Sequence, residues 1–419
     1  MREAQAAGKD GAVVIVGAGQ AGFQAAASLR EAGFAGSLTL VGDEPVAPYQ
    51  RPPLSKAYLT GKVAADSVSL RPGSFYADHR IALQPGTPVV ALDRHRRGAE
   101  LASGERLAYD HLILATGARN RPLPVPGADL PGVVQLRTLA EAEDIRRRLD
   151  GAARVVVVGA GFIGLEFAAM AAARSIAVTV IEAADRVMAR ASSRPISDFV
   201  RETHEAAGIR FAFGAGVTRI VGEHGRAAAV ETAGGDVLPA DLVLIGIGVV
   251  PNVELARDAG LAVADGILVD RHLLTADPAI SAIGNCAACP SVFADGAPTR
   301  IESVQNAVDQ ARCVAARLAG RPAPYAAVPW FWSDQGRLKL QIAGLAHPHD
   351  LAVARGDPGS GAFSVFCFRQ DTLVGVESVN RPADHMLARR LIAERRPLRP
   401  DEAADPAFDL RALVKAAAA

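Results

Sequence analysis

Two glycine-rich turns of the same spacing have the residue types that bind the pyrophosphate of a dinucleotide. Both read G-x-G-x-x-G, with glycines at Gly17, Gly19 and Gly22 in the first turn and at Gly159, Gly161 and Gly164 in the second. In such a turn the first glycine permits a sharp reversal, the second lets a pyrophosphate approach the backbone, and the third lets a helix pack closely on a strand. The phosphate then lies at the helix N-terminus, where N–H groups point at it. Two copies in one chain predict two dinucleotide sites.

A carboxylate follows each turn at roughly 20 residues, the distance from which it can accept a hydrogen bond from a ribose hydroxyl. Asp43 and Glu44 follow the first turn, and Glu182 follows the second. Glu182 would accept from the adenosine 2′-OH and repel a 2′-phosphate, so the second turn is predicted to prefer NADH to NADPH. Arg186 and Arg190 lie just downstream and keep that preference moderate.

Each turn lies between an apolar strand and a helix, and a second strand leads to the carboxylate. Strands are expected at residues 12–16 and 37–41 around the first helix, and at 154–158 and 177–181 around a helix at 165–174. Two more apolar runs, 112–115 and 242–245, end in glycine and mark crossovers between nucleotide domains. The second domain is therefore predicted to be inserted into the first, within an α/β fold of two Rossmann-like, doubly wound domains.

Composition narrows the class of protein. With 419 residues, half of them hydrophobic, the chain is long enough for two or three domains. Its 45 basic and 45 acidic residues balance, which does not suit a nucleic-acid binder. Residues 1–11 lack the apolar core of a secretory signal, and no apolar run is long enough to span a bilayer. Four cysteines suit a reducing compartment, and no Cys or His set has metal-ligand spacing. We expect a cytoplasmic protein that uses no metal, membrane or nucleic acid.

Further motifs resemble one family, the FAD-dependent, NADH-linked ferredoxin reductases of the putidaredoxin reductase and biphenyl dioxygenase reductase type. The motifs are Arg51-Pro52-Pro53-Leu54-Ser55-Lys56, Leu136-Arg137-Thr138, the run from Arg300 to Ala307, and Pro329-Trp330-Phe331-Trp332-Ser333-Asp334-Gln335. The resemblance covers nearly the whole chain. It implies a glutathione reductase-like arrangement with an FAD domain in two segments, an inserted NAD domain and a C-terminal α/β domain. The expected bounds are 1–117 and 246–323, then 118–245, then 324–419.

The resemblance also implies which residues hold each cofactor. Those assigned to FAD are Gly17, Gly19, Ala21, Gly22, Asp43, Arg51, Lys56, Val89, Ala115, Thr116, Gly117, Arg137, Gly284, Asn285, Val304 and Trp332. Those assigned to NADH are Gly159, Gly161, Ile163, Gly164, Glu166, Glu182, Arg190 and Gly248. Relatives usually have aspartate at the position of Asn285. The Asn285 amide oxygen can still accept a hydrogen bond from the ribityl chain, but without charge assistance, so weaker FAD binding is expected.

Three residues are assigned parts in electron transfer. Lys56 would place positive charge near the flavin N5 edge, and Glu166 resembles the carboxylate that pairs with that lysine. Glu166 could instead be a first-turn helix residue favoured by the helix dipole. Trp332 resembles a tryptophan near the flavin, or it could pack in the core of the third domain. The expected reaction is hydride transfer from NADH to FAD, followed by single-electron transfer to a [2Fe-2S] ferredoxin that serves a monooxygenase or a ring-hydroxylating dioxygenase.

Two other functions and one docking surface stay open. Cys286 and Cys289 form a C-x-x-C pair that could act in a thioredoxin-type disulfide reductase, although small buried cysteines at a helix start are the plainer interpretation. A chain of this fold could also be an NAD-sensing, apoptosis-factor-like flavoprotein. The segment 381–399 could form a basic helix that steers an acidic ferredoxin, or merely a solvated face. Its clustered arginines are Arg389, Arg390, Arg395, Arg396 and Arg399.

Overall fold

A computed structural model of the chain describes residues 10–415. Residues 1–9, which belong to the polar lead-in, and residues 416–419 lie outside the described part. The chain divides into two compact units. The first comprises Met1–Gln50, Ser69–Arg119 and Val250–Pro329, and the second comprises Arg51–Val68, Asn120–Val249 and Trp330–Ala419. The segment that carries Lys56 therefore clusters with the second unit, and the three predicted domains stay a prediction.

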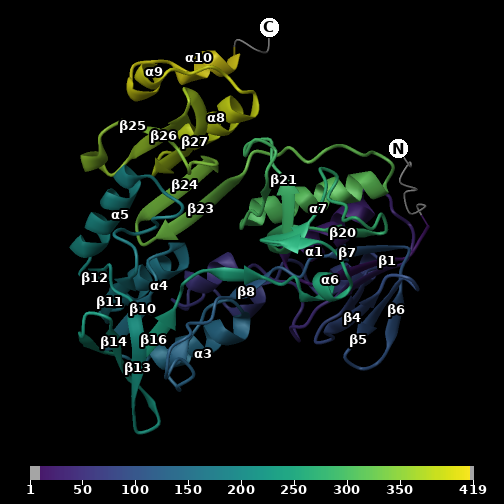
Figure 1. The fold of residues 1–419 in the computed structure, drawn as a ribbon, viewed down its shortest axis with the longest axis horizontal. Coiled ribbons are helices and arrows are strands. Elements are labelled where there is room, and N and C mark those ends of the chain that lie inside the picture. The colour runs from purple at the N-terminus through teal and green to yellow at the C-terminus, as the bar shows by residue number, and fades with distance from the viewer. Residues whose placement is uncertain (1–9, 416–419) are drawn as a thin grey trace. The chain divides into compact units, whose positions relative to one another are not determined.

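The first unit is built on a parallel five-stranded sheet. Its strands in spatial order are β20 (Ile280–Ala282), β7 (His111–Leu114), β1 (Val13–Val16), β2 (Leu38–Val41) and β3 (Ala82–Gln84). Strand β1 has a neighbouring strand on each side, and all four of its residues are buried, as expected for a parallel sheet covered on both faces. Helices α1 (Gln20–Glu31) and α7 (Val304–Leu318) lie side by side (Figure 1), and buried alanines on both helices let their backbones approach closely.

Smaller elements complete the first unit. One antiparallel sheet consists of β4 (Val89–Asp93), β5 (Gly98–Leu101) and β6 (Arg106–Ala108). Another sheet consists of β18 (Val263–Ala264), β19 (Gly266–Leu268), β21 (Ala287–Pro290) and β22 (Pro298–Thr299). The short helices are α2 (Ser74–Asp78), α6 (Glu254–Asp258) and the 3-10 turn η3 (Gly284–Cys286).

The second unit repeats the parallel arrangement. Its strands in spatial order are β12 (Arg210–Phe213), β11 (Ala177–Glu182), β10 (Arg154–Val158), β16 (Leu242–Ile245) and β9 (Val133–Val134). The accompanying elements are the 3-10 turns η1 (Pro52–Ser55) and η2 (Ala65–Val68), the helices α3 (Leu139–Leu149), α4 (Phe162–Ala173) and α5 (Arg194–Ala206), and the antiparallel strands β13 (Val217–Glu223), β14 (Arg226–Thr232) and β15 (Val237–Pro239). Helix α3 begins with a capping box, in which the Thr138 hydroxyl and the Glu141 carboxylate satisfy each other's backbone N–H groups.

The second unit also contains an antiparallel sheet from the C-terminal part of the chain. Its strands in spatial order are β23 (Trp330–Gln335), β24 (Leu338–Gly344), β27 (Thr372–Val379), β26 (Phe363–Arg369) and β25 (Leu351–Arg355). Helix α8 (Pro382–Ala393) packs against β24 and β27. Two short helices follow, α9 (Pro400–Ala404) and α10 (Leu410–Lys415). Strand β23 also contacts α4, the helix that follows the second glycine turn.

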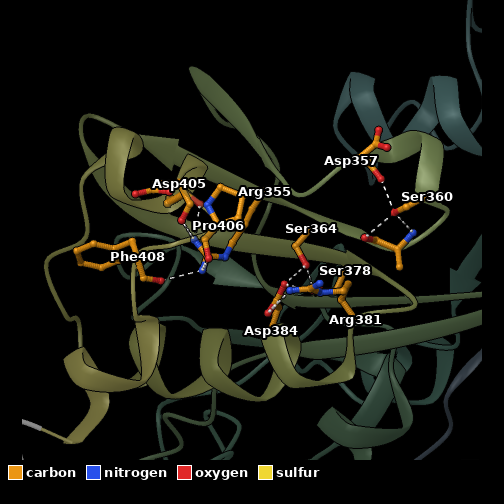
Figure 2. A network of polar contacts seen from close by, with 12 residues as sticks. Arg355, Asp357, Ser360, Ser364, Ser378, Arg381, Asp384, Asp405, Pro406 and Phe408 are labelled. Atoms are coloured by element: carbon orange, nitrogen blue, oxygen red, sulfur yellow. Dashed lines mark hydrogen bonds and ion pairs between the residues drawn. The ribbon is translucent and has the colours of Figure 1, made fainter.

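Figure 2 shows two polar networks that hold this C-terminal part together. Arg355 is buried, and its guanidinium donates to the carbonyl oxygens of Asp405, Pro406 and Phe408. The Ser364 hydroxyl on β26 donates to an Asp384 carboxylate oxygen of α8 over 3.0 Å and can accept from the Ser378 hydroxyl of β27, 3.1 Å away. These hydrogen bonds offset the desolvation penalty of burying the two Nη groups of Arg355 and the hydroxyl of Ser364.

The strands that the sequence predicts around both glycine turns are present within about one residue of their expected ends. Two details of the prediction are wrong. The second helix begins at Phe162 rather than at residue 165, because Gly161 already has the extended backbone of an N-cap. Cys289 lies in strand β21, and Cys286 ends a 3-10 turn, so the cysteines are not at the start of an α-helix.

Candidate functional site

The first glycine turn has two glycines that the fold requires and one that faces open space. A Cβ on Gly17, which has φ +110°, would overlap the Ala115 carbonyl, and a Cβ on Gly22 would overlap the Gly17 carbonyl. A Cβ on Gly19 would have no atom of the described residues within 4 Å. Gly19 is the N-cap of α1, so the open space lies where the helix presents its unpaired N–H groups. This cradle fits a pyrophosphate.

The second glycine turn repeats this division of roles. A Cβ on Gly159, which has φ +104°, would lie 2.5 Å from the Gly246 carbonyl oxygen, and a Cβ on Gly164 would overlap the Gly159 carbonyl. A Cβ on Gly161 would have only the Gly246 oxygen near it, at 4.0 Å. Gly161 is the N-cap of α4. The second turn thus offers the same kind of phosphate cradle.

Glu182 ends β11 beside the second turn. One carboxylate oxygen accepts from the Ala160 N–H at 2.7 Å, and the other accepts from the Ala184 N–H at 2.9 Å. These bonds fix the carboxylate at the end of the strand, and each oxygen keeps a further lone pair for a ribose hydroxyl. Arg186 donates to the Ala189 and Ser192 carbonyls and to the Ser197 hydroxyl, and these bonds hold its guanidinium against the neighbouring backbone.

Arg190 differs from Arg186 because its side chain is exposed. Its guanidinium lies against Gly248, 3.3 Å from where a Cβ on that glycine would be. Gly248 has φ +100° and closes the turn after β16. Ile163, the second residue of α4, is also exposed, with 44% of its surface accessible. The residues that the sequence assigns to NADH therefore gather at the carboxyl ends of β10, β11 and β16.

Most of the predicted FAD residues of the first unit follow the carboxyl ends of β1, β7 and β20, which are neighbouring strands. Gly284 has φ +76°, and a Cβ there would lie 2.9 Å from the Ala21 Cβ, so the turn that carries Asn285 passes over the start of α1. Asp43 follows β2 and accepts from its neighbour Glu44 N–H at 3.0 Å. Val89 begins β4 and Val304 begins α7.

Thr116 and Gly117 are held by a residue that the sequence did not single out. The Thr116 hydroxyl donates to the Asn252 carbonyl at 2.7 Å, and the Asn252 amide donates back to the Thr116 carbonyl at 2.8 Å. The Asn252 N–H also donates to the Gly117 carbonyl. Asn252 is remote in sequence and has no motif around it, so only the structure reveals this clamp.

Lys56 and Glu166 form a short ion pair within the second unit. The distance between Lys56 Nζ and Glu166 Oε2 is 2.7 Å. The Lys56 side chain is 20% exposed and that of Glu166 is 2% exposed, so little water screens the pair. Glu166 lies in the second turn of α4, which does not support a first-turn role for this residue. The structure thus brings together the lysine and the carboxylate that the resemblance pairs.

Two serines complete the environment of Glu166, and neither was assigned a role from the sequence. The Ser55 hydroxyl donates to Glu166 Oε2 at 2.5 Å, and the Ser333 hydroxyl donates to Glu166 Oε1 at 2.7 Å. Ser55 and Ser333 both lie inside motifs that carry the family resemblance. A charged donor and two hydroxyls therefore surround one buried carboxylate.

The remaining predicted residues of the second unit lie on η1, on β23 and before α3. Arg51 donates to the Arg137 carbonyl oxygen at 2.5 Å. Trp332 is partly exposed, and its ring centroid lies 5.6 Å from that of Trp330. The Arg389 guanidinium lies over the Trp330 ring at 4.8 Å. Trp332 is therefore not a fully buried core residue.

The C-x-x-C pair lacks the properties of a redox-active dithiol. All four cysteines are free thiols, and Cys286 and Cys289 are 0% and 3% exposed. Burial raises the pKa of the Cys286 thiol, and burial together with Cys313 and Asp270 raises the pKa of Cys289 to about 12. Thiols of this kind are neutral at physiological pH and do not act as nucleophiles.

The basic C-terminal segment is not one helix, and its charge is partly offset by acidic neighbours of Arg396 and Arg399. Helix α8 ends at Ala393, so Arg395, Arg396 and Arg399 lie in the connection to α9 or at its start. Arg396 pairs with Glu394 at 2.9 Å, and Arg399 pairs with Asp401 and Glu402. Arg390 is exposed and forms no ion pair with any residue between 10 and 415. The prediction of a basic helix is therefore wrong for its second half.

Within residues 10–415, no helix is long and apolar enough to cross a bilayer, and no three acidic, histidine or cysteine side chains cluster in a way that could hold a metal ion.

Two parallel sheets, each with a glycine cradle at a helix N-terminus, define an oxidoreductase fold that binds two dinucleotides. Residues 11–311 match the family model described as pyridine nucleotide-disulphide oxidoreductase, and residues 330–414 match the reductase C-terminal model. The chain belongs to the pyridine nucleotide-disulphide oxidoreductase family. Members of this family bind FAD and depend on NAD(P)H, so the predicted fold class, enzyme class and cofactors are confirmed.

Individual relatives are ferredoxin reductases. Rhodocoxin reductase of Rhodococcus erythropolis is 55% identical over 399 residues, which span 95% of this chain and 93% of the relative. The crystal structure of the ferredoxin reductase for the CYP199A2 system from Rhodopseudomonas palustris has a TM-score of 0.94 at 51% identity, with 96% and 99% of the two chains covered. The crystal structure of the covalent putidaredoxin reductase–putidaredoxin complex also has a TM-score of 0.94, at 42% identity, with 98% of this chain and 99% of the other chain covered. The predicted family is confirmed.

Proposed function

We propose that this protein oxidises NADH and, with FAD, passes single electrons to a [2Fe-2S] ferredoxin that feeds a monooxygenase or a ring-hydroxylating dioxygenase. The observation that carries the proposal is the ion pair of Lys56 with the buried Glu166, 2.7 Å apart, in the same unit as the second glycine cradle. The names of the relatives support it, since one is a rhodocoxin reductase and another was crystallised in a covalent complex with putidaredoxin. Bound FAD would supply the conversion of a two-electron hydride donor into a one-electron donor.

The protein's own residues would bind the two cofactors, orient them and supply charge at the flavin. The cradle at Gly17, Gly19 and Gly22 would hold the FAD pyrophosphate, and the cradle at Gly159, Gly161 and Gly164 would hold that of NADH. Glu182 would accept from the NADH ribose and repel a 2′-phosphate. Lys56 would present a cation to the flavin edge, and Glu166 would hold the Lys56 ammonium in place. The proposed domains are 1–117 with 246–323 for FAD, 118–245 for NADH and 324–419 for the C-terminal domain.

The other FAD contacts that we propose are the remaining residues that the family resemblance assigns to FAD. They are Ala21, Asp43, Val89, Ala115, Thr116, Gly117, Gly284, Asn285 and Val304, together with Arg51, Arg137 and Trp332. The other NADH contacts are Ile163, Arg190 and Gly248. The compartment is proposed to be the cytoplasm, because all four thiols are free and a reducing environment keeps them so.

A disulfide reductase is disfavoured because the Cys286 and Cys289 thiols are buried and have raised pKa values. An NAD-sensing flavoprotein would bind the same cofactors, so only turnover separates it from a reductase.

The test uses the purified full-length protein loaded with FAD. NADH should reduce the flavin, and cytochrome c reduction should become rapid only when a [2Fe-2S] ferredoxin is added. Lys56→Met should slow flavin reduction by NADH by about tenfold or more, because a charge-assisted stabilisation of roughly 1.5–3 kcal/mol is lost. A colourless protein that binds no FAD in calorimetry, or flavin reduced by NADH with no transfer to any [2Fe-2S] ferredoxin, would contradict the proposal.

A further inference from the structure

The carboxylate of Glu166 is one end of a buried chain of hydrogen bonds that begins in another part of the second unit. Gln335, two residues beyond Ser333 on β23, donates from its amide nitrogen to the Ser333 hydroxyl at 3.2 Å. The Gln335 amide oxygen lies 2.9 Å from Nε2 of His204, in the last turn of α5. The chain therefore links α5, β23 and α4 through side chains alone.

The donors in this chain all point the same way. The Gln335 nitrogen donates to Ser333 and also contacts the Met188 sulfur at 3.8 Å, so its oxygen is the acceptor for His204 Nε2–H. Ser333 accepts from Gln335 and has its own proton available for Glu166 Oε1. Burial lowers the pKa of His204, which keeps the imidazole neutral and able to donate from Nε2. Each group thus fixes the orientation of the next.

The hydrogen-bond chain can hold the Glu166 carboxylate in place because its members are buried. Ser333 is 0% exposed, and Gln335, His204 and Glu166 are each 3% exposed. Water cannot replace a missing donor without a rearrangement, so a buried acceptor that loses its partner must move or stay unsatisfied. For Glu166, movement would turn the carboxylate oxygen that faces Lys56.

We propose that Ser333 and Gln335 are positioning residues that hold the Glu166 carboxylate, and through it the Lys56 ammonium, in the orientation required at the flavin. This rests on the proposed function, because the role of Lys56 at the flavin belongs to that proposal. Ser333 binds the oxygen of Glu166 that Lys56 does not use, so the two donors fix both ends of one carboxylate. Gln335 in turn stops the Ser333 hydroxyl from rotating to another acceptor.

The hydrogen-bond chain also reaches the second glycine cradle. Met188, which contacts Gln335, donates its backbone N–H to the carbonyl of Ala160 between the first two glycines of that turn. Gln335 therefore lies between the residue that braces the NADH cradle and the serine that holds Glu166. Support from neighbouring residues of this kind sets the geometry of a reactive group without touching the reactants.

The test compares Ser333→Ala and Gln335→Met with Ser364→Ala in the FAD-loaded protein. Ser364 is a matched control because it is also a fully buried serine of the same antiparallel sheet, and its hydroxyl bonds Asp384 and Ser378 instead of Glu166 (Figure 2). Single-turnover reduction by NADH should slow about tenfold in Ser333→Ala and about threefold in Gln335→Met, as expected when a hydrogen bond to a charged group is lost. The NADH dissociation constant should change less than twofold, and Ser364→Ala should match the wild type.

A second readout does not depend on turnover. The ratio of reduced to oxidised FAD at a fixed dye potential should fall about tenfold in Ser333→Ala, which is about 30 mV for a two-electron couple. Unfolding of the apoprotein should show a coupling of at least threefold between Ser333→Ala and Lys56→Met in a double-mutant cycle. Wild-type rates and potentials in both variants, or no coupling in the cycle, would overturn the inference alone. A wild-type protein that is not reduced by NADH would overturn the proposed function as well.

Discussion

Gly42 and Glu182 occupy the same position in the two nucleotide-binding sheets. Val16 pairs with Val41, the residue before Gly42, just as Val158 pairs with Ile181, the residue before Glu182. A Cβ on Gly42 would lie 2.6 Å from the Ala18 Cβ, whereas Glu182 reaches back to the N–H of Ala160, the counterpart of Ala18. In the first turn, Gly42 therefore packs against Ala18, and the carboxylate follows one residue later, at Asp43. In the second turn, the carboxylate of Glu182 itself holds the turn by its bond to Ala160.

Removal of the Glu182 charge should relax the choice of nucleotide. In Glu182→Gln the side chain can still accept one backbone hydrogen bond, but it no longer repels a 2′-phosphate. We expect the ratio of kcat/KM for NADH over that for NADPH to fall about tenfold, the effect of roughly 1.4 kcal/mol. Glu205→Gln, on the exposed side of α5, is the control and should leave the ratio unchanged. An unchanged ratio in Glu182→Gln would show that this residue does not determine the preference for NADH over NADPH.

Substitutions of the glycines in the first turn should affect FAD affinity and folding stability separately. Gly19→Ala adds a methyl group where the described residues leave open space and where φ is −81°, so the thermal midpoint should move by no more than about 2 °C. FAD affinity, measured by flavin fluorescence, should fall at least tenfold because the methyl group occupies the phosphate cradle. Gly22→Ala should instead destabilise the apoprotein by about 3 kcal/mol or more, since its Cβ overlaps the Gly17 carbonyl. Equal FAD affinity in Gly19→Ala and the wild type would refute the cradle.

His385 should make stability depend on pH. Burial, and secondarily the charge of Arg389, lower the pKa of His385 to about 4 in the folded protein. The unfolded chain takes up a proton near pH 6.5, so the contribution of neutral His385 is complete above that pH and is lost as the pH falls toward 4. The loss at pH 5.5 should be roughly 1.4 kcal/mol. Neither ring nitrogen has a hydrogen-bond partner among the described residues, so His385→Phe should show a smaller drop in thermal midpoint between pH 7.5 and 5.5 than the wild type. Identical drops would contradict this assignment.

Ferredoxin docking should respond to Arg390 more than to Arg399. Arg390 is exposed and has no ion-pair partner within residues 10–415, whereas Arg399 already pairs with Asp401 and Glu402. Arg390→Ala should raise the KM for a [2Fe-2S] ferredoxin several-fold at low salt, and Arg399→Ala should change it less than twofold. Turnover with ferredoxin should also fall steeply with salt while ferricyanide reduction does not. Parallel salt curves for the two acceptors would exclude electrostatic docking.

The sequence predicts well those features that a short stretch of chain determines. The strands beside Gly17 and Gly159 and the carboxylate at Glu182 were all expected, because a glycine turn between an apolar strand and a helix has few alternative conformations. The family resemblance added Lys56 and Glu166, which lie 110 residues apart and which no local pattern joins.

The supporting residues could not be predicted for the same physical reason. Ser333 lies 167 residues from Glu166, and His204 lies 131 residues from Gln335, so their contacts exist only after the sheets and helices have packed. A serine on a half-apolar strand and a histidine on an amphipathic helix have no distinctive spacing. The one available signal was that Ser55, Ser333 and Gln335 lie within the motifs that carry the resemblance.

The clamp around Arg355 binds main-chain carbonyl oxygens and reads no side chain of the segment that it holds. A main-chain clamp is tolerant of sequence drift, because any residue that keeps the same backbone path offers the same carbonyls. Substitutions between Asp405 and Phe408 that keep the backbone path should therefore leave these bonds intact, whereas a substitution of Arg355 removes all of them at once. Arg355 therefore fixes the path of a segment that is far from it in sequence, and it does so without a hydrogen bond to the side chains of that segment.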